Sequence, residues 1–243
     1  MQPLISVSTG LMYKFHKDRN LMIQFLKKLN LDGIEIHLAD PDTLLSLNID
    51  SENISYLQSL QHISIHAPWK DMVYRKDKKT KRVLNSLREL KIQINAKVIV
   101  IHKKQIEDFE IFKDFSDLPF AIENDDWKVK NGIKTIGDMR NFINNHSNWD
   151  IVLDIAHALT VGGYNLINEF IDAFGSNIVQ MHASMLNRDM SDHTFLYKHD
   201  NKQMKNTIKK MKLLNVPLIL EVVAKTKKEV DEIIKEIAYI ENI

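Results

Sequence analysis

Residues 62–68 read HISIHAP and residues 97–104 read KVIVIHKK, and both stretches show the pattern that decides the fold. Each is a short apolar run that ends in a histidine. Short, continuous apolar runs are typical of strands buried on both faces of a parallel sheet. Five other runs end in a histidine or an acidic residue in the same way: GIEIHL (33–38), PFAIEND (119–125), IVLDIAH (151–157), NIVQMHAS (177–184) and PLILEVV (217–223). This recurrence indicates one polar centre that is assembled from many strand ends.

The spacing of the runs predicts eight strand–helix units. The predicted strands cover residues 4–8, 33–38, 62–66, 97–102, 119–124, 151–155, 177–183 and 217–223, and they read as apolar throughout. The segments between them show helical periodicity, as in Val83, Leu87 and Leu90. Eight such units in 243 residues predict an α/β protein with the (β/α)8 TIM-barrel fold. We expect a single domain over residues 1–243, because no Pro-, Gly- or Ser-rich linker interrupts the units.

An open, doubly wound sheet is the alternative fold. It would require a glycine-rich phosphate loop after the first strand. Residues 7–15 read VSTGLMYKF and lack a GxGxxG pattern, which favours the barrel.

The composition narrows the classes of function. The formal net charge of +1 argues neither for nor against an anionic partner. Because the chain has no cysteine, disulfides and thiolate metal sites are excluded, and His, Asp and Glu remain as ligands. We expect a cytoplasmic protein without a membrane partner, since there is neither a secretory signal nor an apolar run long enough to cross a membrane.

In a TIM barrel the carboxyl ends of all strands meet at one face, where catalysis takes place. Six residues are therefore expected to converge at one mouth: His66, His102, Glu123, Asp154, His182 and Glu221. A buried polar cluster of this kind is costly unless metals or hydrogen bonds satisfy it. One histidine at a strand end is more often structural, but six residues at equivalent positions favour a metal centre.

Two further histidines are candidate ligands. Asp154 and His157 form a D-x-x-H pair that leaves the sixth strand, and His193 lies in the loop after the seventh. Glu35 and His37 are left out of the set, because only one of them is expected to face the barrel interior.

The segment 70–91 is basic, with nine Lys and Arg against three acidic residues. We expect a solvated helix face, although the segment begins beside His66, and part of it could line the mouth and attract phosphates. Trp69 and Trp127 are candidate stacking groups for a sugar ring or a base, with a lid over the barrel as the alternative.

The same residues resemble those of a known superfamily. H-A-P after the third strand, E-N on the fifth, D-x-x-H on the sixth and D-H after the seventh are similar to the pattern of the xylose isomerase-like TIM barrels (AP endonuclease family 2). Within this superfamily, the ligand pattern is most similar to that of endonuclease IV, the zinc-dependent apurinic/apyrimidinic endonuclease. The resemblance covers residues 33 to 223.

This resemblance implies three metal sites. The first would be held by His66, His102 and Glu123. The second would be held by Glu123, Asp154, His182 and Glu221, with Glu123 as the bridge. The third would be held by His157 and His193. Among these residues, Glu123 and Glu221 are expected to be catalytic.

The chain departs from the family pattern at several points. The family places an aspartate two residues before the last histidine, where this chain has Ser191, with Asp189 and Asp192 nearby. The family's H-P-G after the fourth strand reads H-K-K here, and its E-N-T reads E-N-D. The third site therefore lacks its expected carboxylate.

Two activities fit this ligand set. An endonuclease IV-like phosphodiester hydrolase would act on damaged DNA at abasic sites with two or three Zn²⁺ ions, which histidine ligands favour. A sugar or sugar-phosphate isomerase or epimerase would instead act on a small sugar with one Mn²⁺ or Mg²⁺ ion at Glu123, Asp154, His182 and Glu221. A non-catalytic binding module is a third alternative.

Overall fold

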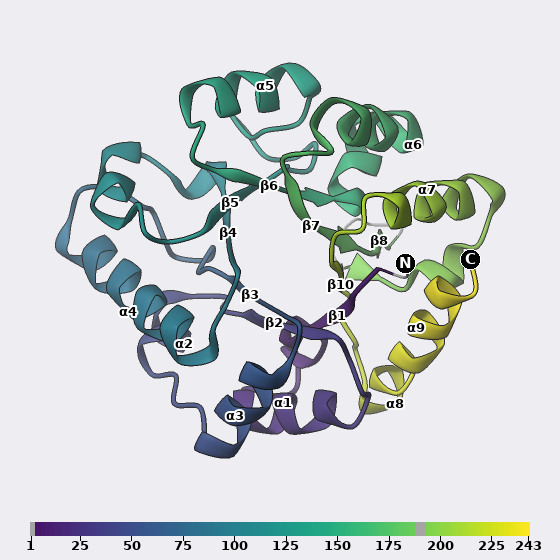
Figure 1. The fold of residues 1–243 in the computed structure, drawn as a ribbon, viewed down its shortest axis with the longest axis horizontal. Coiled ribbons are helices and arrows are strands. Elements are labelled where there is room, and N and C mark those ends of the chain that lie inside the picture. The colour runs from purple at the N-terminus through teal and green to yellow at the C-terminus, as the bar shows by residue number, and fades with distance from the viewer. Residues whose placement is uncertain (1–2, 188–192) are drawn as a thin grey trace.

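Eight parallel strands close into a barrel in the computed structural model, which describes residues 3–187 and 193–243 (Figure 1). Their order around the barrel is β1-β10-β7-β6-β5-β4-β3-β2, and β1 pairs with both β10 and β2. The strands are β1 Ile5–Ser8, β2 Gly33–His37, β3 His62–His66, β4 Val98–His102, β5 Phe120–Glu123, β6 Asp150–Asp154, β7 Ile178–Ala183 and β10 Leu218–Leu220. The predicted (β/α)8 fold is confirmed, and every predicted strand overlaps an observed one.

Helical segments connect the strands and cover the outside of the barrel (Figure 1). The α-helices are α1 Arg19–Lys27, α2 Pro41–Leu45, α3 Ser51–Ser59, α4 Lys78–Ile94, α5 Ile136–Asn145, α6 Ile155–Phe174, α7 Lys202–Leu213, α8 Lys227–Val230 and α9 Ile233–Glu241. Short 3-10 helices cover Thr9–Met12, Lys103–Gln105, Phe109–Phe115 and Leu196–His199. A small antiparallel sheet, β8 Met185–Leu186 and β9 His193–Thr194, follows β7 and was not predicted.

Helix α4 illustrates why these segments form helices. Asp77 caps its start by accepting a hydrogen bond from the N–H group three residues later (2.8 Å), and Asn95 ends it in the left-handed conformation, with φ of 55°. Val83 and Leu87 are buried on the inner face, whereas most of the basic residues are exposed. The basic segment 70–91 is therefore mainly a solvated face, as expected.

The core has two layers, one outside and one inside the barrel wall. The larger layer packs the strands against the helices. The inner apolar cluster of the described residues is small: Val98, Val100, Ala121 and Val152. The interior positions of β2, β3 and β7 are instead polar, and include Glu35, Ser64 and Gln180. The prediction that the strands are apolar throughout is wrong for these three, because every second residue faces an interior that holds a polar layer.

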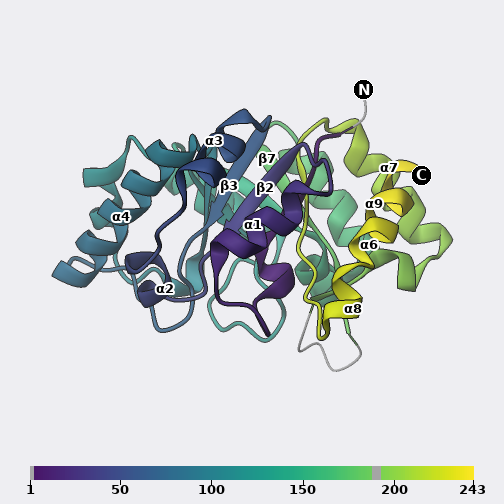
Figure 2. The same ribbon diagram turned by 90° about the horizontal axis from the view of Figure 1, so that it is seen from below.

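The two ends of the barrel differ in what they carry. Figure 2 shows the N-terminus at one end, whereas α2 and α8, which follow β2 and β10, lie toward the other.

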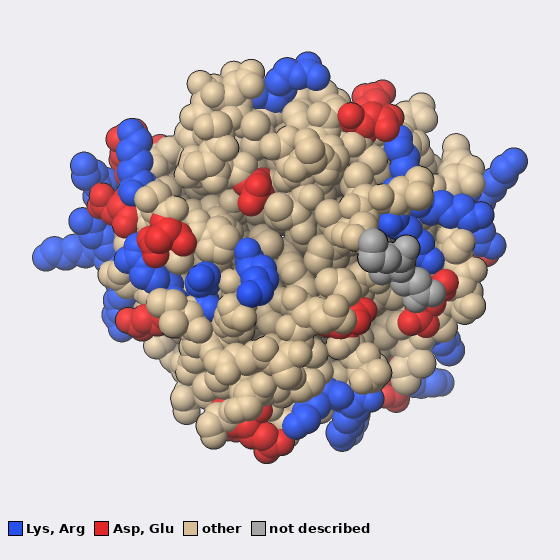
Figure 3. All heavy atoms as spheres, viewed as in Figure 1, with Lys and Arg blue, Asp and Glu red and all other residues tan. Residues whose placement is uncertain are grey.

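On the face seen in Figure 3, Lys and Arg are interspersed with Asp and Glu, in keeping with the formal net charge of +1. In the described part of the chain, no helix has both the length and the apolarity needed to cross a membrane.

Candidate metal centre

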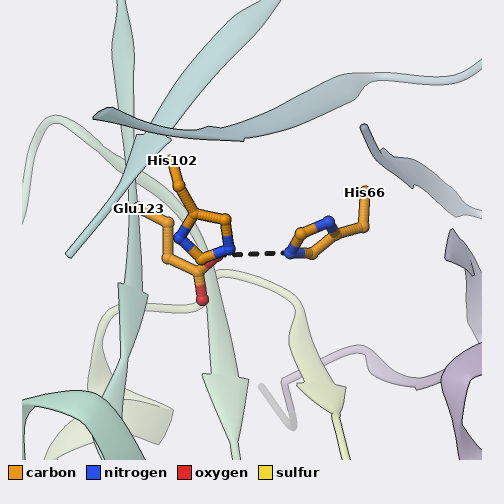
Figure 4. A group of neighbouring side chains, drawn as sticks. All are labelled: His66, His102 and Glu123. Carbon is orange, nitrogen blue, oxygen red and sulfur yellow. Dashed lines mark ion pairs between the residues drawn. The ribbon is translucent and has the colours of Figure 1, made fainter. Parts of the chain in front are cut away.

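The polar strand ends meet around Glu123, which ends β5 and is fully buried. Its Oε1 lies 3.0 Å from Nδ1 of His182. Its Oε2 lies 3.4 Å from Nε2 of His66 and 3.3 Å from Nε2 of His102. Figure 4 shows these last two imidazoles, from β3 and β4, turned toward the carboxylate on β5. One carboxylate therefore faces three histidines that come from three other strands.

The eight predicted ligands fall into three groups, and the ligand atoms of each group lie within 4.8 Å of one another. The groups are His66, His102 and Glu123; then Glu123, Asp154, His182 and Glu221; and finally Asp154, His157 and His193. Glu123 belongs to the first two groups and Asp154 to the last two. Shared carboxylates of this kind are what a multinuclear metal site requires, because each can bridge two ions.

The third group takes its carboxylate from β6 instead of from the loop before His193. The ligand atoms of Asp154, His157 and His193 lie within 4.8 Å of one another, and the His157 and His193 ring centroids are 5.5 Å apart. The loop positions named for this role, Ser191, Asp189 and Asp192, lie outside the described residues. The third group is therefore complete as a set of three ligands without them.

Asn124 joins the ends of β5 and β6 and so aligns the ligands on both strands. Its side-chain amide donates to the carbonyl of Asp154 (2.9 Å) and accepts from the N–H of Asp154 (2.8 Å). Oδ1 of Asp154 caps α6 by accepting from the N–H of His157 (2.7 Å). The carbonyl of Asn124 lies 2.9 Å from Nδ1 of His157, which leaves Nε2 as the ligand atom of that ring.

The centre concentrates negative charge in a buried place. Burial raises the pKa of Glu123, but His102 and His182 lower it well below its usual value, so this carboxylate is ionised. Burial lowers the pKa of His157, but Asp154 and Glu123 raise it to about 9. Protonated imidazoles and bound cations would therefore compete for the same carboxylates.

Two carboxylate oxygens test whether these residues fit a metal. Oε2 of Glu123 and Oδ2 of Asp154 are buried without a hydrogen-bond partner in the described structure. An unsatisfied carboxylate oxygen in a buried site is costly, and both belong to the carboxylates that two groups share. Divalent cations with nitrogen and oxygen ligands satisfy such oxygens, so the donor set fits a metal centre.

Glu35 and His37 both face the barrel interior, so the expectation that only one of them would do so was wrong. Residues two apart on a strand point to the same face. Oε2 of Glu35 lies 3.2 Å from Nε2 of His182. His37 accepts a hydrogen bond from Nε1 of Trp69 (3.2 Å), and its ring lies 5.3 Å from that of His66. Both residues could have been identified from the sequence, because they lie two positions apart on the predicted strand and therefore share a face.

Asp125 is another neighbour of the centre that was not predicted. Its Oδ1 lies 3.6 Å from Nδ1 of His102, and neither atom has a hydrogen-bond partner among the described residues. Gly132 leaves room for this carboxylate, because a Cβ there would lie 2.7 Å from it. Asp125 therefore stands behind His102, on the side of the ring opposite to Glu123.

A cavity of about 250 Å³ opens over the centre. Its walls include members of all three ligand groups, and Trp69 and Trp127 line it from the loops after β3 and β5. Lys104 and Lys128 add positive charge to the walls. The segment 70–91, which the structure describes in full, contributes no residue to this lining, so the cationic groups come from other loops.

A buried glutamate of α9 holds the segment that follows His193. Glu236 accepts hydrogen bonds from the N–H groups of Leu196 (2.6 Å) and Tyr197 (3.0 Å). Burial raises the pKa of Glu236 to about 7 against the effect of these two hydrogen bonds. The folded state therefore favours the protonated form of this side chain more than the unfolded chain does.

We expect the free energy of unfolding to fall as the pH rises from about 4.5 to 7, by about 3 kcal/mol for Glu236 alone. The sign follows because a raised pKa stabilises the folded state below the unfolded pKa, and this contribution is lost above the folded one. Denaturant unfolding at pH 5 and pH 8 measures it, with Glu236→Gln as the variant that cannot ionise. Equal pH dependence in both proteins would contradict the prediction.

Comparison by sequence finds neither a protein-family model nor a curated protein that matches the chain. Comparison by structure does find likenesses. Endonuclease IV from Thermus thermophilus has a TM-score of 0.69 and 14% identity, over 99% of this chain and 100% of its own. A 3-keto-D-glucoside 4-epimerase from E. coli has a TM-score of 0.67 and 12% identity over 100% of both chains. A xylose isomerase domain containing protein from Salmonella typhimurium has a TM-score of 0.67 and 14% identity, over 99% of this chain and 98% of its own.

Fold and site together define a (β/α)8 barrel with a candidate divalent-metal centre at the carboxyl ends of its strands. More particularly, the fold of the chain is similar to that of endonuclease IV, of a sugar epimerase and of a protein with a xylose isomerase domain, in agreement with the resemblance seen in the sequence. An endonuclease and an epimerase are similar to it to nearly the same degree. The fold is therefore compatible with both phosphodiester hydrolysis and epimerisation and does not discriminate between them.

Proposed function

We propose that the protein is a multinuclear metal-dependent phosphodiesterase of the endonuclease IV type, which acts at abasic sites in DNA. One observation carries the proposal: three ligand groups are continuous through the shared carboxylates Glu123 and Asp154. An enzyme with one metal would need only the group that contains His182 and Glu221. It would leave the ligand roles of His66, His102, His157 and His193 unexplained.

The three groups would hold Zn²⁺, which imidazole ligands favour over Mg²⁺. When bound, the ions would polarise a phosphoryl oxygen and a water molecule for hydrolysis of the phosphodiester. Two features would keep these sites in place. Glu123 is fully buried, and Asn124 forms two hydrogen bonds that hold Asp154 against the adjacent strand. This rigidity keeps the three groups in one fixed arrangement beneath the cavity.

The cavity walls suit a nucleotide that has been turned out of a duplex. Lys104 and Lys128 would contact the phosphates, since cationic side chains are the main source of affinity for a nucleic-acid backbone. Trp69 and Trp127 are 37% and 50% exposed beside the same cavity, where they would stack on neighbouring bases. An abasic sugar is the nucleotide that leaves the stack at the smallest cost.

A sugar isomerase or epimerase is the second candidate, and a specific contact favours it. Glu123 and Glu221 both line the cavity, and their oxygens lie 3.0 and 3.1 Å from Nδ1 of His182. Two carboxylates beside one ligand group suit the exchange of a proton at the carbon next to a carbonyl. In this case one divalent ion would be held, and the cavity would accept a small sugar.

Two measurements test the proposed function directly. Elemental analysis of the purified protein is expected to find two or three zinc ions per chain. The metal-loaded protein is expected to cleave a duplex that carries a tetrahydrofuran analogue of an abasic site and to leave the undamaged duplex intact. A content of one ion, or no incision by the loaded protein, would count against the phosphodiesterase.

His66→Ala separates the two candidates. We expect the variant to lose one ion per chain and at least about 100-fold in phosphodiesterase activity, since a Lewis acid contributes several kcal/mol to the transition state. An epimerase would keep its ion and its activity, because His66 is not in the group of Glu221. His146→Ala is the control, since His146 stacks on Phe109 (ring centroids 4.1 Å apart) and belongs to no ligand group of the described residues. Wild-type incision by His66→Ala would contradict the prediction.

A further inference from the structure

A polar layer lies in the barrel interior directly beneath the metal ligands. Oε2 of Glu35, on β2, accepts from the hydroxyl of Ser64 (3.0 Å) and from the amide of Gln180 (3.1 Å). Oε1 of Gln180 lies 3.0 Å from Nε2 of His62. All four side chains are buried. Among the described residues, the layer contacts the centre through the ring of His182.

The two ring nitrogens of His182 face different surroundings. Nδ1 points into the centre, 3.0 Å from Glu123 and 3.1 Å from Glu221. Nε2 points into the polar layer, 3.2 Å from Oε2 of Glu35 and 3.0 Å from Nε2 of Gln180. A ring nitrogen that binds a metal carries no proton, so the proton of a neutral, ligating His182 must lie on Nε2.

Of the described neighbours of Nε2, only Glu35 can accept that proton. Gln180 places its amide nitrogen, which is a donor, toward His182, so this contact is a hydrogen bond only in the other tautomer, in which Nε2 carries no proton. The oxygen of Gln180 is engaged by His62. A carboxylate, in contrast, is an acceptor at both oxygens. The partner of Nε2 in the metal-binding tautomer is therefore Glu35.

We propose that Glu35 is a positioning residue that holds His182 in the tautomer with a proton on Nε2 and so presents Nδ1 to the metal centre. The inference rests on the metal centre of the proposed function and not on its substrate. A carboxylate that acts through a ligating histidine orients the ring and raises its basicity as a ligand.

The burial of Glu35 supports this role over a purely structural one. The side chain has no exposed surface, and its Oε1 has no hydrogen-bond partner in the described structure. A buried carboxylate with an unsatisfied oxygen destabilises a core, and an apolar residue at this position would pack the interior at a lower cost. The contact of Glu35 with the metal ligand His182 gives a reason for a carboxylate at this position.

Glu35→Gln tests the proposal, because the amide keeps the size of the side chain and removes the charge. Zn²⁺ affinity is measured by competition with a chromophoric chelator, and the site geometry by the visible absorption of the Co²⁺-loaded protein. We expect Zn²⁺ to bind about 10- to 100-fold more weakly than to wild type, with an altered Co²⁺ spectrum. Ser64→Ala is the matched control, since it removes one other hydrogen bond of Glu35 and spares the contact of Glu35 with His182. This control is expected to bind Zn²⁺ much as wild type does.

The ¹⁵N spectrum of Zn²⁺-loaded wild type labelled at histidine gives a second readout. We expect His182 to carry its proton on Nε2, with the downfield ¹H shift of a hydrogen bond to a carboxylate, and the absence of that shift would count against Glu35 even if Glu35→Gln does not fold. A proton on Nδ1, or unchanged Zn²⁺ affinity and Co²⁺ spectrum in folded Glu35→Gln, would overturn the proposal. Equal losses in Ser64→Ala would overturn it as well. Abasic-site incision by wild type, measured in parallel, tests the substrate separately.

Discussion

Glu123→Gln is expected to abolish activity in either reaction, with a loss of about 10⁴-fold, equivalent to about 5.5 kcal/mol of transition-state stabilisation. Among the described residues, Glu123 is the one carboxylate shared by the groups of His66 and His182, so a neutral amide there weakens two metal sites together. Incision of abasic DNA, epimerisation of ketoses and zinc content per chain measure the effect. Far-ultraviolet circular dichroism checks that the barrel is retained.

Glu52→Gln is the matched control for this substitution. Glu52 is an exposed residue of α3 that pairs with Lys27 on the surface, and its change leaves the centre untouched. We expect wild-type activity and metal content in the control. A Glu123→Gln protein that keeps its full metal content and more than a tenth of its activity would contradict the role of Glu123 as the shared ligand.

Metal loading is expected to stabilise the protein strongly. Saturation of one site at 1,000 times its dissociation constant raises the free energy of unfolding by about 4 kcal/mol. In a chain of this size, that corresponds to an increase of about 8–16 °C in Tm. Oε2 of Glu123 and Oδ2 of Asp154, which accept no hydrogen bond in the described structure, give the physical reason, since a cation satisfies both. Thermal unfolding after chelation, with and without added Zn²⁺, measures the shift.

Glu123→Gln provides the control for the thermal experiment as well. Because it lacks the shared anionic ligand, we expect its Tm to respond far less to added Zn²⁺ than that of wild type. An equal response in both proteins would place the stabilising ions elsewhere on the chain. An unchanged wild-type Tm would contradict a metal centre built from these residues.

Six of the eight predicted ligands could be found from the sequence because each stands at or just after the end of an apolar run, whereas His157 and His193 lie further along the chain. In a parallel barrel that position alone determines the face on which a residue lies. His66 and His102 follow the same rule from neighbouring strands, and both contact Glu123 as expected. The fold and the convergence of these six residues were therefore predictable together, whereas the division of the ligands into groups followed from the family resemblance.

Residues behind the ligands could not be found in this way. Asp125 was read as part of a departure from a motif, and only the folded chain shows it 3.6 Å from His102. Gln180 lies 145 residues from Glu35 along the chain, so their hydrogen bond is invisible in sequence spacing. Glu35 and His37 were recoverable in principle, because residues two apart on a strand share a face.

The sequence by itself determined the barrel, the strands that end in a polar residue and the set of side chains that meet at the mouth of the barrel. These follow from local properties: the period of apolar residues and the common direction of parallel strands. The tertiary structure alone decided that Asp154 completes the third group and that Glu35 contacts His182. Such contacts depend on distances between side chains on different strands, and barrel closure, not spacing along the chain, sets those distances.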